Sequence, residues 1–116
     1  MHELGLLTGV VTAVTQVAES RGATGVEKGG LRVGTMSGTV EEALHGAWPL
    51  ATQGTLVDGA SLEIEIIQAQ VWCPRCESNQ DIDEFFALTC PACSTPTGQL
   101  VSGREFEVTF ADLTND

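Results

Sequence analysis

Apolar side chains near the start of the chain recur at spacings of three and four. These positions are Leu4, Leu7, Val11, Val14 and Ala18. Polar residues occupy the other side, so the periodicity predicts a one-sided helix. We expect it to end near Arg21-Gly22, because glycine readily adopts the left-handed conformation that follows many helices. Such a helix must bury its apolar stripe against a sheet or a second helix.

The next apolar segment predicts one strand over residues 25–34. It contains Val26, Leu31 and Val33, interrupted by the pair Gly29-Gly30. A bulge or irregularity is expected at the glycine pair. A hairpin is the alternative interpretation.

A second helix is predicted over about residues 40–53. Thr39 and Glu42 have the spacing of a capping box, in which a hydroxyl and a carboxylate satisfy free amides at the helix start. The expected buried residues are Ala43, Leu44, Ala47 and Trp48. Pro49 falls inside this span and lacks a backbone N–H, so we expect a kink or an early end there.

Two further segments alternate between apolar and acidic residues, as half-buried strands do. The first runs from Leu62 through Ile66, changes phase at Ile67 and continues into Cys73. The second contains Phe106, Val108 and Phe110. The simplest arrangement pairs these two strands antiparallel, with the segment between them inserted as a separate lobe.

That inserted segment holds all four cysteines, as Cys73-Pro-Arg-Cys76 and Cys90-Pro-Ala-Cys93 with thirteen residues between the pairs. Two residues between thiols allow one tight turn to direct both sulfurs at one ion, and two such turns complete a tetrahedron. The proline after the first cysteine of each pair favours the turn. We therefore predict a structural zinc ion on four thiolates. A rubredoxin-like iron site and two redox dithiols are the alternatives.

Together these elements predict an α+β fold. Two helices pack on a small, about three-stranded mixed sheet, and a four-cysteine zinc-ribbon-like lobe is inserted. The expected domains are residues 1–70 plus 101–116, and residues 71–100. The lobe has little core of its own, so we expect its fold to depend on the metal. Its apolar cover would come from Phe85, Phe86 and Leu88.

Charge and composition argue against several classes of function. Five Lys and Arg against sixteen Asp and Glu give a net charge of −11, which argues against binding nucleic acid or anionic membrane. No apolar run approaches the roughly 18 residues of a membrane span. The start lacks the basic region of a signal peptide, so a cytoplasmic protein is expected. We find no catalytic triad, phosphate-binding glycine loop or catalytic carboxylate pair, and do not expect an enzyme.

Four features stand in one order along the chain. They are the Met1-His2-Glu3 start, a Gly34-x-x-Ser37-Gly38 step, the two cysteine pairs, and Ser102-Gly103-Arg104-Glu105. In this order and spacing the chain resembles the HypA/HybF family of nickel-incorporation proteins, which help to mature [NiFe] hydrogenases. The resemblance covers the whole chain.

The resemblance implies a nickel metallochaperone with a separate zinc lobe. It implies delivery of nickel to the hydrogenase large-subunit precursor, with a maturation GTPase as partner. His2 matches the family's nickel ligand, with nearby main-chain nitrogens completing much of the site, and Glu3 matches a supporting position. Cys73, Cys76, Cys90 and Cys93 match the zinc ligands. The sequence does not distinguish a monomer from a homodimer, and a urease role stays open.

One position departs from the family pattern. Relatives often carry an acidic nickel ligand two positions after the Ser-Gly step, where this chain has Val40. Either Glu41 takes that role by a one-residue shift, or the acidic ligand is absent. His45, in the middle of the second helix, is expected to have a surface or packing role. The rival function from another class is a zinc-ribbon interaction adaptor that delivers no metal.

Overall fold

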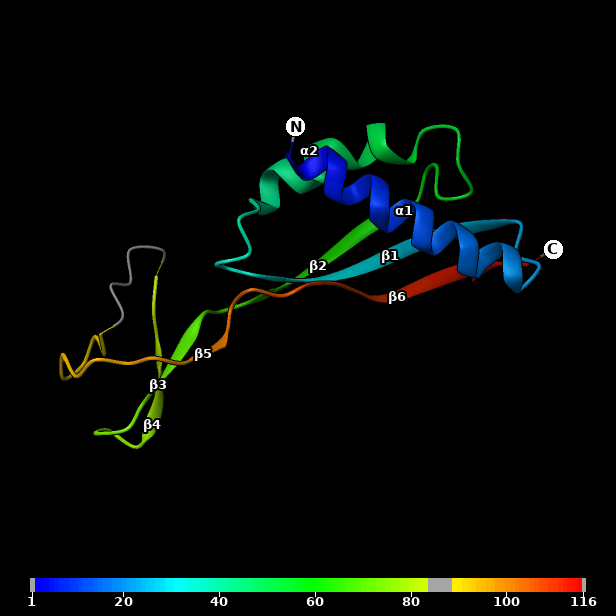
Figure 1. The fold of residues 1–116 in the computed structure, drawn as a ribbon. Coiled ribbons are helices and arrows are strands. Elements are labelled where there is room, and N and C mark those ends of the chain that lie inside the picture. Colours follow the sequence, from blue (N-terminus) through cyan, green and yellow to red (C-terminus); the bar gives the residue numbers. More distant parts are fainter. Residues whose placement is uncertain (1, 84–88, 116) are drawn as a thin grey trace. The chain divides into compact units, whose positions relative to one another are not determined.

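The computed structural model describes residues 2–83 and 89–115 (Figure 1). It divides into two compact units, which we name the helical unit and the cysteine unit. The helical unit comprises Met1–Leu31, Thr39–Glu65 and Glu107–Asp116, and the cysteine unit comprises Arg32–Gly38 and Ile66–Phe106. Phe85, Phe86 and Leu88, expected to cover the lobe, lie outside the described residues.

The elements of the helical unit follow the order βαβ after a first helix. They are α1 (His2–Ser20), β1 (Gly25–Gly34), α2 (Glu41–Thr52), β2 (Ser61–Ile67) and β6 (Phe106–Thr114). Figure 1 shows both helices on the same side of the sheet that these strands form. No helix in the described part of the chain is both long and apolar enough to cross a membrane.

The first helix buries one stripe and ends as expected. Its buried side chains are Leu7, Val10, Val11, Val14 and Ala18. Gly22 has a φ of +69°. The Gly22 N–H donates to Glu19 O over 3.1 Å, and the Ala23 N–H donates to Ala18 O over 2.9 Å. This pair of bonds is the Schellman motif, which satisfies carbonyls that the helix leaves free.

The sheet corrects one expectation about topology. Its strand order is β2-β1-β6, so β1 separates the two strands that we expected to pair. Thr24 N–H donates to Thr114 O and Gly34 N–H to Glu105 O, each over 2.8 Å, which makes β1 and β6 antiparallel. Thr35 N–H donates to Ile67 O over 2.9 Å, so the carboxyl ends of β1 and β2 meet and these strands are parallel. The sheet is therefore mixed.

The strand order has a physical reason, which is that the most buried strand takes the central position. Leu31 and Val33 of β1 are buried, and β1 is continuous over its expected span without a hairpin. A helical crossover such as α2 places the next strand parallel to the previous one. The strands with alternating acidic residues, β2 and β6, then occupy the two edges of the sheet.

The second helix has the expected bounds within one residue, but it differs from expectation at its N-cap and at Pro49. Its N-cap is Val40, which makes no side-chain capping hydrogen bond, so the predicted capping box at Thr39 is wrong because the helix begins one residue later. We expected either a kink or an early end at Pro49, and the early end is wrong because Pro49 lies inside a helix that continues to Thr52. The Thr52 hydroxyl lies within hydrogen-bond distance of Trp48 O, at 3.0 Å, and of Pro49 O, at 3.3 Å, and Pro49 O is one of the last four carbonyls of the helix.

The buried face of α2 is narrower than expected. Leu44 and Trp48 are buried, Ala47 is half-buried, and Ala43 is exposed. The indole N–H of Trp48 donates to Ala60 O over 2.8 Å, so the buried donor has a partner. α2 therefore packs through two large buried side chains, and not through all four of the residues that were expected to be buried.

The cysteine unit contains a small antiparallel sheet. It is built from β3 (Gln70–Cys73), β4 (Ser78–Asp81) and β5 (Leu100–Ser102) in the order β4-β3-β5. Its buried core consists of Ala69, Val71 and Ile82, with Met36 and Leu100 packed against it. The phase change at Ile67 is confirmed, since Ile66 is exposed while Ala69, Val71 and Cys73 are buried.

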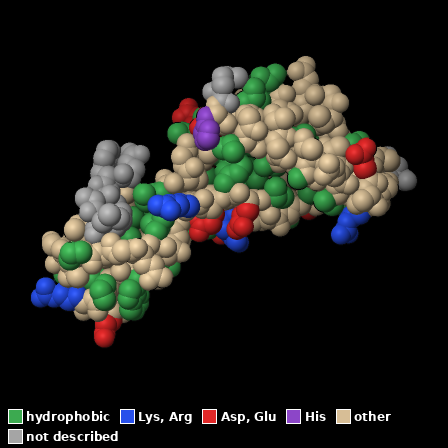
Figure 2. Space-filling model, in the orientation of Figure 1, with side chains coloured by type: hydrophobic (Ala, Val, Ile, Leu, Met, Phe, Trp, Pro, Cys, Tyr) green, Lys and Arg blue, Asp and Glu red, His purple; other side chains and the backbone are tan. Residues whose placement is uncertain are grey.

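Several large apolar side chains reach the surface of the described chain. Examples are Val40, Leu50, Trp72, Val108 and Phe110. Figure 2 shows hydrophobic side chains at the surface of both units. Val108 and Phe110 were expected on the buried side of their strand, and this expectation is wrong because both are exposed. The Phe110 ring lies over Gly30 of β1, which has no side chain to cover it.

Candidate metal centre

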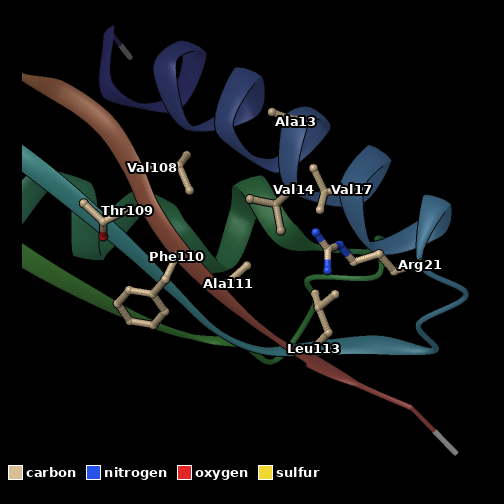
Figure 3. Close-up of a pocket in the computed structure, with 9 residues that line it drawn as sticks. All are labelled: Ala13, Val14, Val17, Arg21, Val108, Thr109, Phe110, Ala111 and Leu113. Atoms are coloured by element: carbon tan, nitrogen blue, oxygen red, sulfur yellow. The ribbon is translucent and has the colours of Figure 1, made fainter.

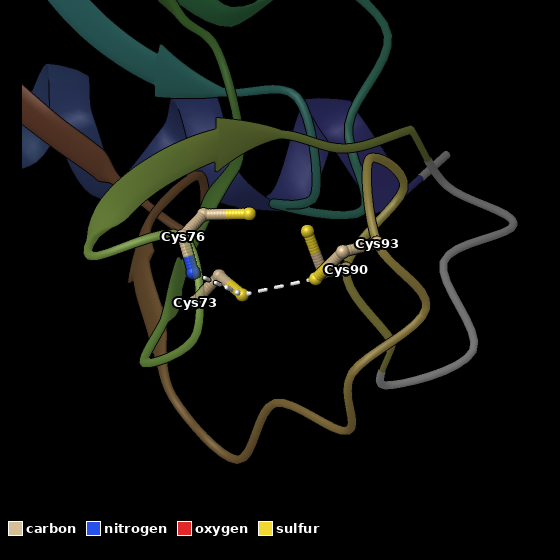
Figure 4. A group of neighbouring side chains, drawn as sticks. All are labelled: Cys73, Cys76, Cys90 and Cys93. Carbon is tan, nitrogen blue, oxygen red and sulfur yellow. Dashed lines mark hydrogen bonds between the residues drawn. The ribbon is translucent and has the colours of Figure 1, made fainter.

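The four cysteines come together in the cysteine unit (Figure 4). Cys73 is the last residue of β3 and pairs with Ser78 across the turn that carries Cys76. Cys90 and Cys93 belong to a second turn, between the bridge residues Thr89 and Pro96. All four Sγ atoms lie within 4.8 Å of one another, and none forms a disulfide.

The two turns share one backbone feature. The residue after the second cysteine of each pair has positive φ, 52° at Glu77 and 63° at Ser94. Backbone amides also point at the sulfurs, with Cys76 N 3.4 Å from Cys73 Sγ and Ala92 N 3.4 Å from Cys90 Sγ. An N–H donor stabilises the charged form of its acceptor. Both turns are therefore shaped to hold thiolates.

The protonation of the sulfurs is uneven. The pKa of Cys93 is lowered to about 6, first by its side-chain hydrogen bond with Thr95, then by a backbone hydrogen bond from that residue. Cys93 Sγ and Thr95 Oγ1 are 3.1 Å apart. The pKa of Cys76 is raised to about 12, first by hydrogen bonding with Cys93 and then with Cys73. Cys76 would therefore have to lose its proton to bind a metal cation as a thiolate.

The donor set fits a structural metal. Four thiolates suit Zn²⁺ in tetrahedral coordination, and four protein ligands leave no open position for a water or a substrate. Cys73 and Cys90 are buried, Cys93 is half-buried and Cys76 is exposed. Four sulfurs also suit iron, so the geometry fits the zinc prediction without choosing between the two metals.

The residues expected at the nickel site lie in the helical unit. His2 is exposed in the first turn of α1, Glu3 is half-buried beside it, and Glu41 opens α2. Glu41 Oε2 is 3.5 Å from Nε2 of His45. Within the described residues, only the four cysteines form a group of three or more metal-ligating side chains. His2, Glu3 and Glu41 are therefore not brought together by their side chains.

Sequence reasoning missed two contributors to the cysteine unit. One is Thr95, and the only feature in the sequence that could have indicated its role is a hydroxyl group two residues after Cys93. The other is the close approach of Gly34 to Gly103, where a Cβ on Gly34 would collide with the backbone of Gly103. Both glycines were noted as parts of separate motifs, but their contact depends on long-range pairing.

Comparison with known proteins adds the decisive observation. The family model described as "Hydrogenase/urease nickel incorporation, metallochaperone, hypA" matches residues 1–113. The chain belongs to the HypA family. Hydrogenase maturation factor HypA of Chloroflexus aurantiacus is 35% identical over 108 residues, covering 93% of this chain and 95% of its own. The protein of that name from Nitrosospira multiformis is 36% identical over 113 residues, covering 97% of each chain.

Solved structures agree on the fold. The solution structure of the Ni metallochaperone HypA from Helicobacter pylori superposes with a TM-score of 0.66 at 15% identity, covering 98% of each chain. A second solution structure of a HypA protein gives a TM-score of 0.69 at 18% identity, covering 97% of this chain and 96% of the other. The resemblance inferred from the motifs and the predicted α+β fold are confirmed.

Proposed function

We propose that this HypA-family protein binds Ni²⁺ at His2 and delivers it to the [NiFe] hydrogenase large-subunit precursor during maturation. The observation that carries this proposal is the family match across residues 1–113, whose description names nickel incorporation. The four-cysteine group supports a second, structural metal ion in the same chain. The two metals would then occupy separate units with different donor chemistry.

The position of His2 suits a transported ion. His2 is exposed in the first turn of α1, where the first backbone N–H groups of a helix have no acceptor within the helix. An imidazole with neighbouring deprotonated main-chain nitrogens favours square-planar or tetragonal Ni²⁺. Thiolates would hold nickel tightly, whereas a few ligands at a helix start can open and release it.

Glu3 and Glu41 have secondary parts in the proposal. Glu3 places a carboxylate in the first turn of α1 and supports the bound cation by its charge. Glu41 is the candidate for the acidic ligand missing at Val40, and its carboxylate now pairs with His45. To ligate nickel, the Glu41 carboxylate would have to leave His45. Weaker nickel binding in Glu41→Gln would show that the acidic ligand has shifted to Glu41, and unchanged binding would show that it is absent.

The proposed function also includes a structural zinc ion and protein partners. Zinc on the four cysteines would order the cysteine unit, whose buried core of Ala69, Val71 and Ile82 is small. A hydrogenase-maturation GTPase and the large-subunit precursor would be the protein partners, in the cytoplasm, with the chaperone as a monomer or homodimer. Delivery would proceed by protein contact, without catalysis by the chaperone.

Calorimetric nickel titration of the zinc-loaded protein, with no residues added before Met1, tests the proposal. We expect about one Ni²⁺ per chain at micromolar or tighter affinity. His2→Ala should lose it while retaining zinc, and the matched variant His45→Ala should keep it. Equal nickel binding by wild type and His2→Ala would remove His2 from the mechanism. Absence of nickel binding in the wild type would favour the zinc-ribbon adaptor.

A further inference from the structure

A groove of about 440 Å³ runs between α1 and β6 within the helical unit (Figure 3). Val14 and Val17 line it from the helix, and Val108, Ala111 and Leu113 line it from the strand. None of the residues proposed for nickel or zinc borders this groove. It is therefore a separate feature of the surface.

The groove is apolar and open to solvent. Val17 is 49% exposed and Val108 is 40% exposed. Isolated apolar side chains on a surface need no explanation, but a contiguous apolar groove is typical of binding sites. A ligand that fills this groove would remove these side chains from water.

The strand that forms one wall is available for pairing. β6 pairs with β1 on one side, and within the described residues no strand lies on its other side. An edge strand presents unpaired N–H and C=O groups that an extended peptide can join. β6 contains neither lysine nor proline, two residue types that commonly block such pairing.

A single cation stands at one end of the groove. Figure 3 shows the guanidinium of Arg21 pointing into the groove, near Leu113. Among residues 2–83 and 89–115, Arg21 has no ion-pair partner, although acidic residues outnumber basic ones by sixteen to five. An arginine in this position suits a carboxylate, which it can bind through two parallel hydrogen bonds.

We propose that this groove binds an extended segment of a partner protein as an additional strand on β6. The segment would place alternate apolar side chains against Val17 and Val108, and pair a carboxylate with Arg21. Residues 108–113 span about 17 Å at the usual rise per residue, which suits a segment of about six residues. A second copy of this chain is a poorer occupant, because both copies carry a net charge of −11 and would repel each other. This inference goes beyond nickel delivery and does not rest on it.

A peptide titration followed by amide NMR shifts tests the proposal. The probe is an N-acetylated hexapeptide of alternating valine and threonine that ends in leucine and aspartate, with a free C-terminus. We expect shifts along α1 from Val14 to Arg21 and along β6, and weaker binding by about tenfold in Arg21→Gln. The matched variant Arg104→Gln, exposed in the cysteine unit, should bind as the wild type does.

A second pair of variants separates binding from folding. Val17→Glu stands four residues before Arg21, so the new carboxylate can pair with Arg21 along the helix and support α1. It should abolish peptide binding without lowering the unfolding temperature. Gln16→Glu adds the same charge one residue away, outside the groove lining, and should leave binding unchanged.

Three results would overturn the proposal. One is the absence of shifts along β6 at millimolar peptide. Another is equal affinity for the free acid and for an amidated peptide in which asparagine replaces aspartate. The third is a wild-type dimer in sedimentation that Val17→Glu dissociates, since the occupant would then be a second copy of this chain.

Discussion

Gly34, at the end of β1, lies backbone to backbone with Gly103, which follows β5. A Cβ on Gly34 would collide with the Gly103 carbonyl group. Gly103 has a φ of +121°, and its carbonyl accepts the Met36 N–H over 2.7 Å. This contact brings together, within the cysteine unit, the sequence motif that begins at Gly34 and the distant motif that contains Gly103.

Gly34→Ala should therefore destabilise the protein strongly. The Cβ meets backbone that cannot rotate aside, so the strands must separate, at a cost of about 2–4 kcal/mol in the free energy of unfolding. Urea denaturation of the zinc-loaded protein measures this. Gly98→Ala is the matched control because a Cβ there meets no atom within 4 Å, and its effect should stay within about 0.5 kcal/mol. Similar stabilities for the two variants would show that the close approach does not exist.

Gly9→Ala should have the opposite effect. Gly9 is exposed in the middle of α1, and a Cβ there has open space around it. Alanine is favoured over glycine in a helix interior by about 1 kcal/mol, so the urea midpoint should rise with an unchanged slope. A lower midpoint would indicate that this face of α1 is covered in solution.

Cys90→Ser should abolish zinc binding and unfold the cysteine unit alone. A buried thiolate is lost from the set of four, and the small core around Val71 cannot hold the unit without its metal. Metal analysis should find no zinc. Amide NMR should show collapsed dispersion for residues of the cysteine unit, whereas α1 residues keep their shifts. Unchanged dispersion throughout would mean that the unit folds without metal.

Thr95→Val should release zinc at a higher pH. The Thr95 hydroxyl is the largest of several causes that lower the pKa of Cys93 to about 6, so protons compete with the metal for this sulfur only in acid. Removing the hydroxyl raises that pKa, and protons then compete from a higher pH as the solution is acidified. A chromogenic zinc chelator can follow release during a pH titration, with exposed Thr89→Val as control. Coincident release curves for Thr95→Val and the wild type would exclude the hydroxyl from this role.

Local patterns predicted much of the fold. The end of α1 near Gly22, the bounds of β1 and the grouping of the cysteines followed from spacing between near neighbours. The placement of β1 between β2 and β6 did not, because alternation marks a strand without identifying its partners. The N-cap at Val40 was missed for a similar reason, since a capping box is a pattern that the backbone need not use.

The cysteine site and the proposed nickel site differ in how much of each the sequence could predict. The cysteine site consists of side chains whose number and spacing are visible in the sequence, and the structure brings all four together. The nickel site would depend on main-chain nitrogens beside His2, which every residue possesses and no pattern reveals. There the family resemblance supplied what periodicity and spacing could not.

X-ray absorption at the nickel K-edge, on zinc-loaded protein with one equivalent of Ni²⁺, most directly tests the division of the two metals between the units. We expect nitrogen and oxygen scatterers around nickel, with one imidazole contribution that disappears in His2→Ala and no sulfur. Sulfur scattering around nickel in the wild type would place the ion on the cysteines and contradict nickel binding at His2.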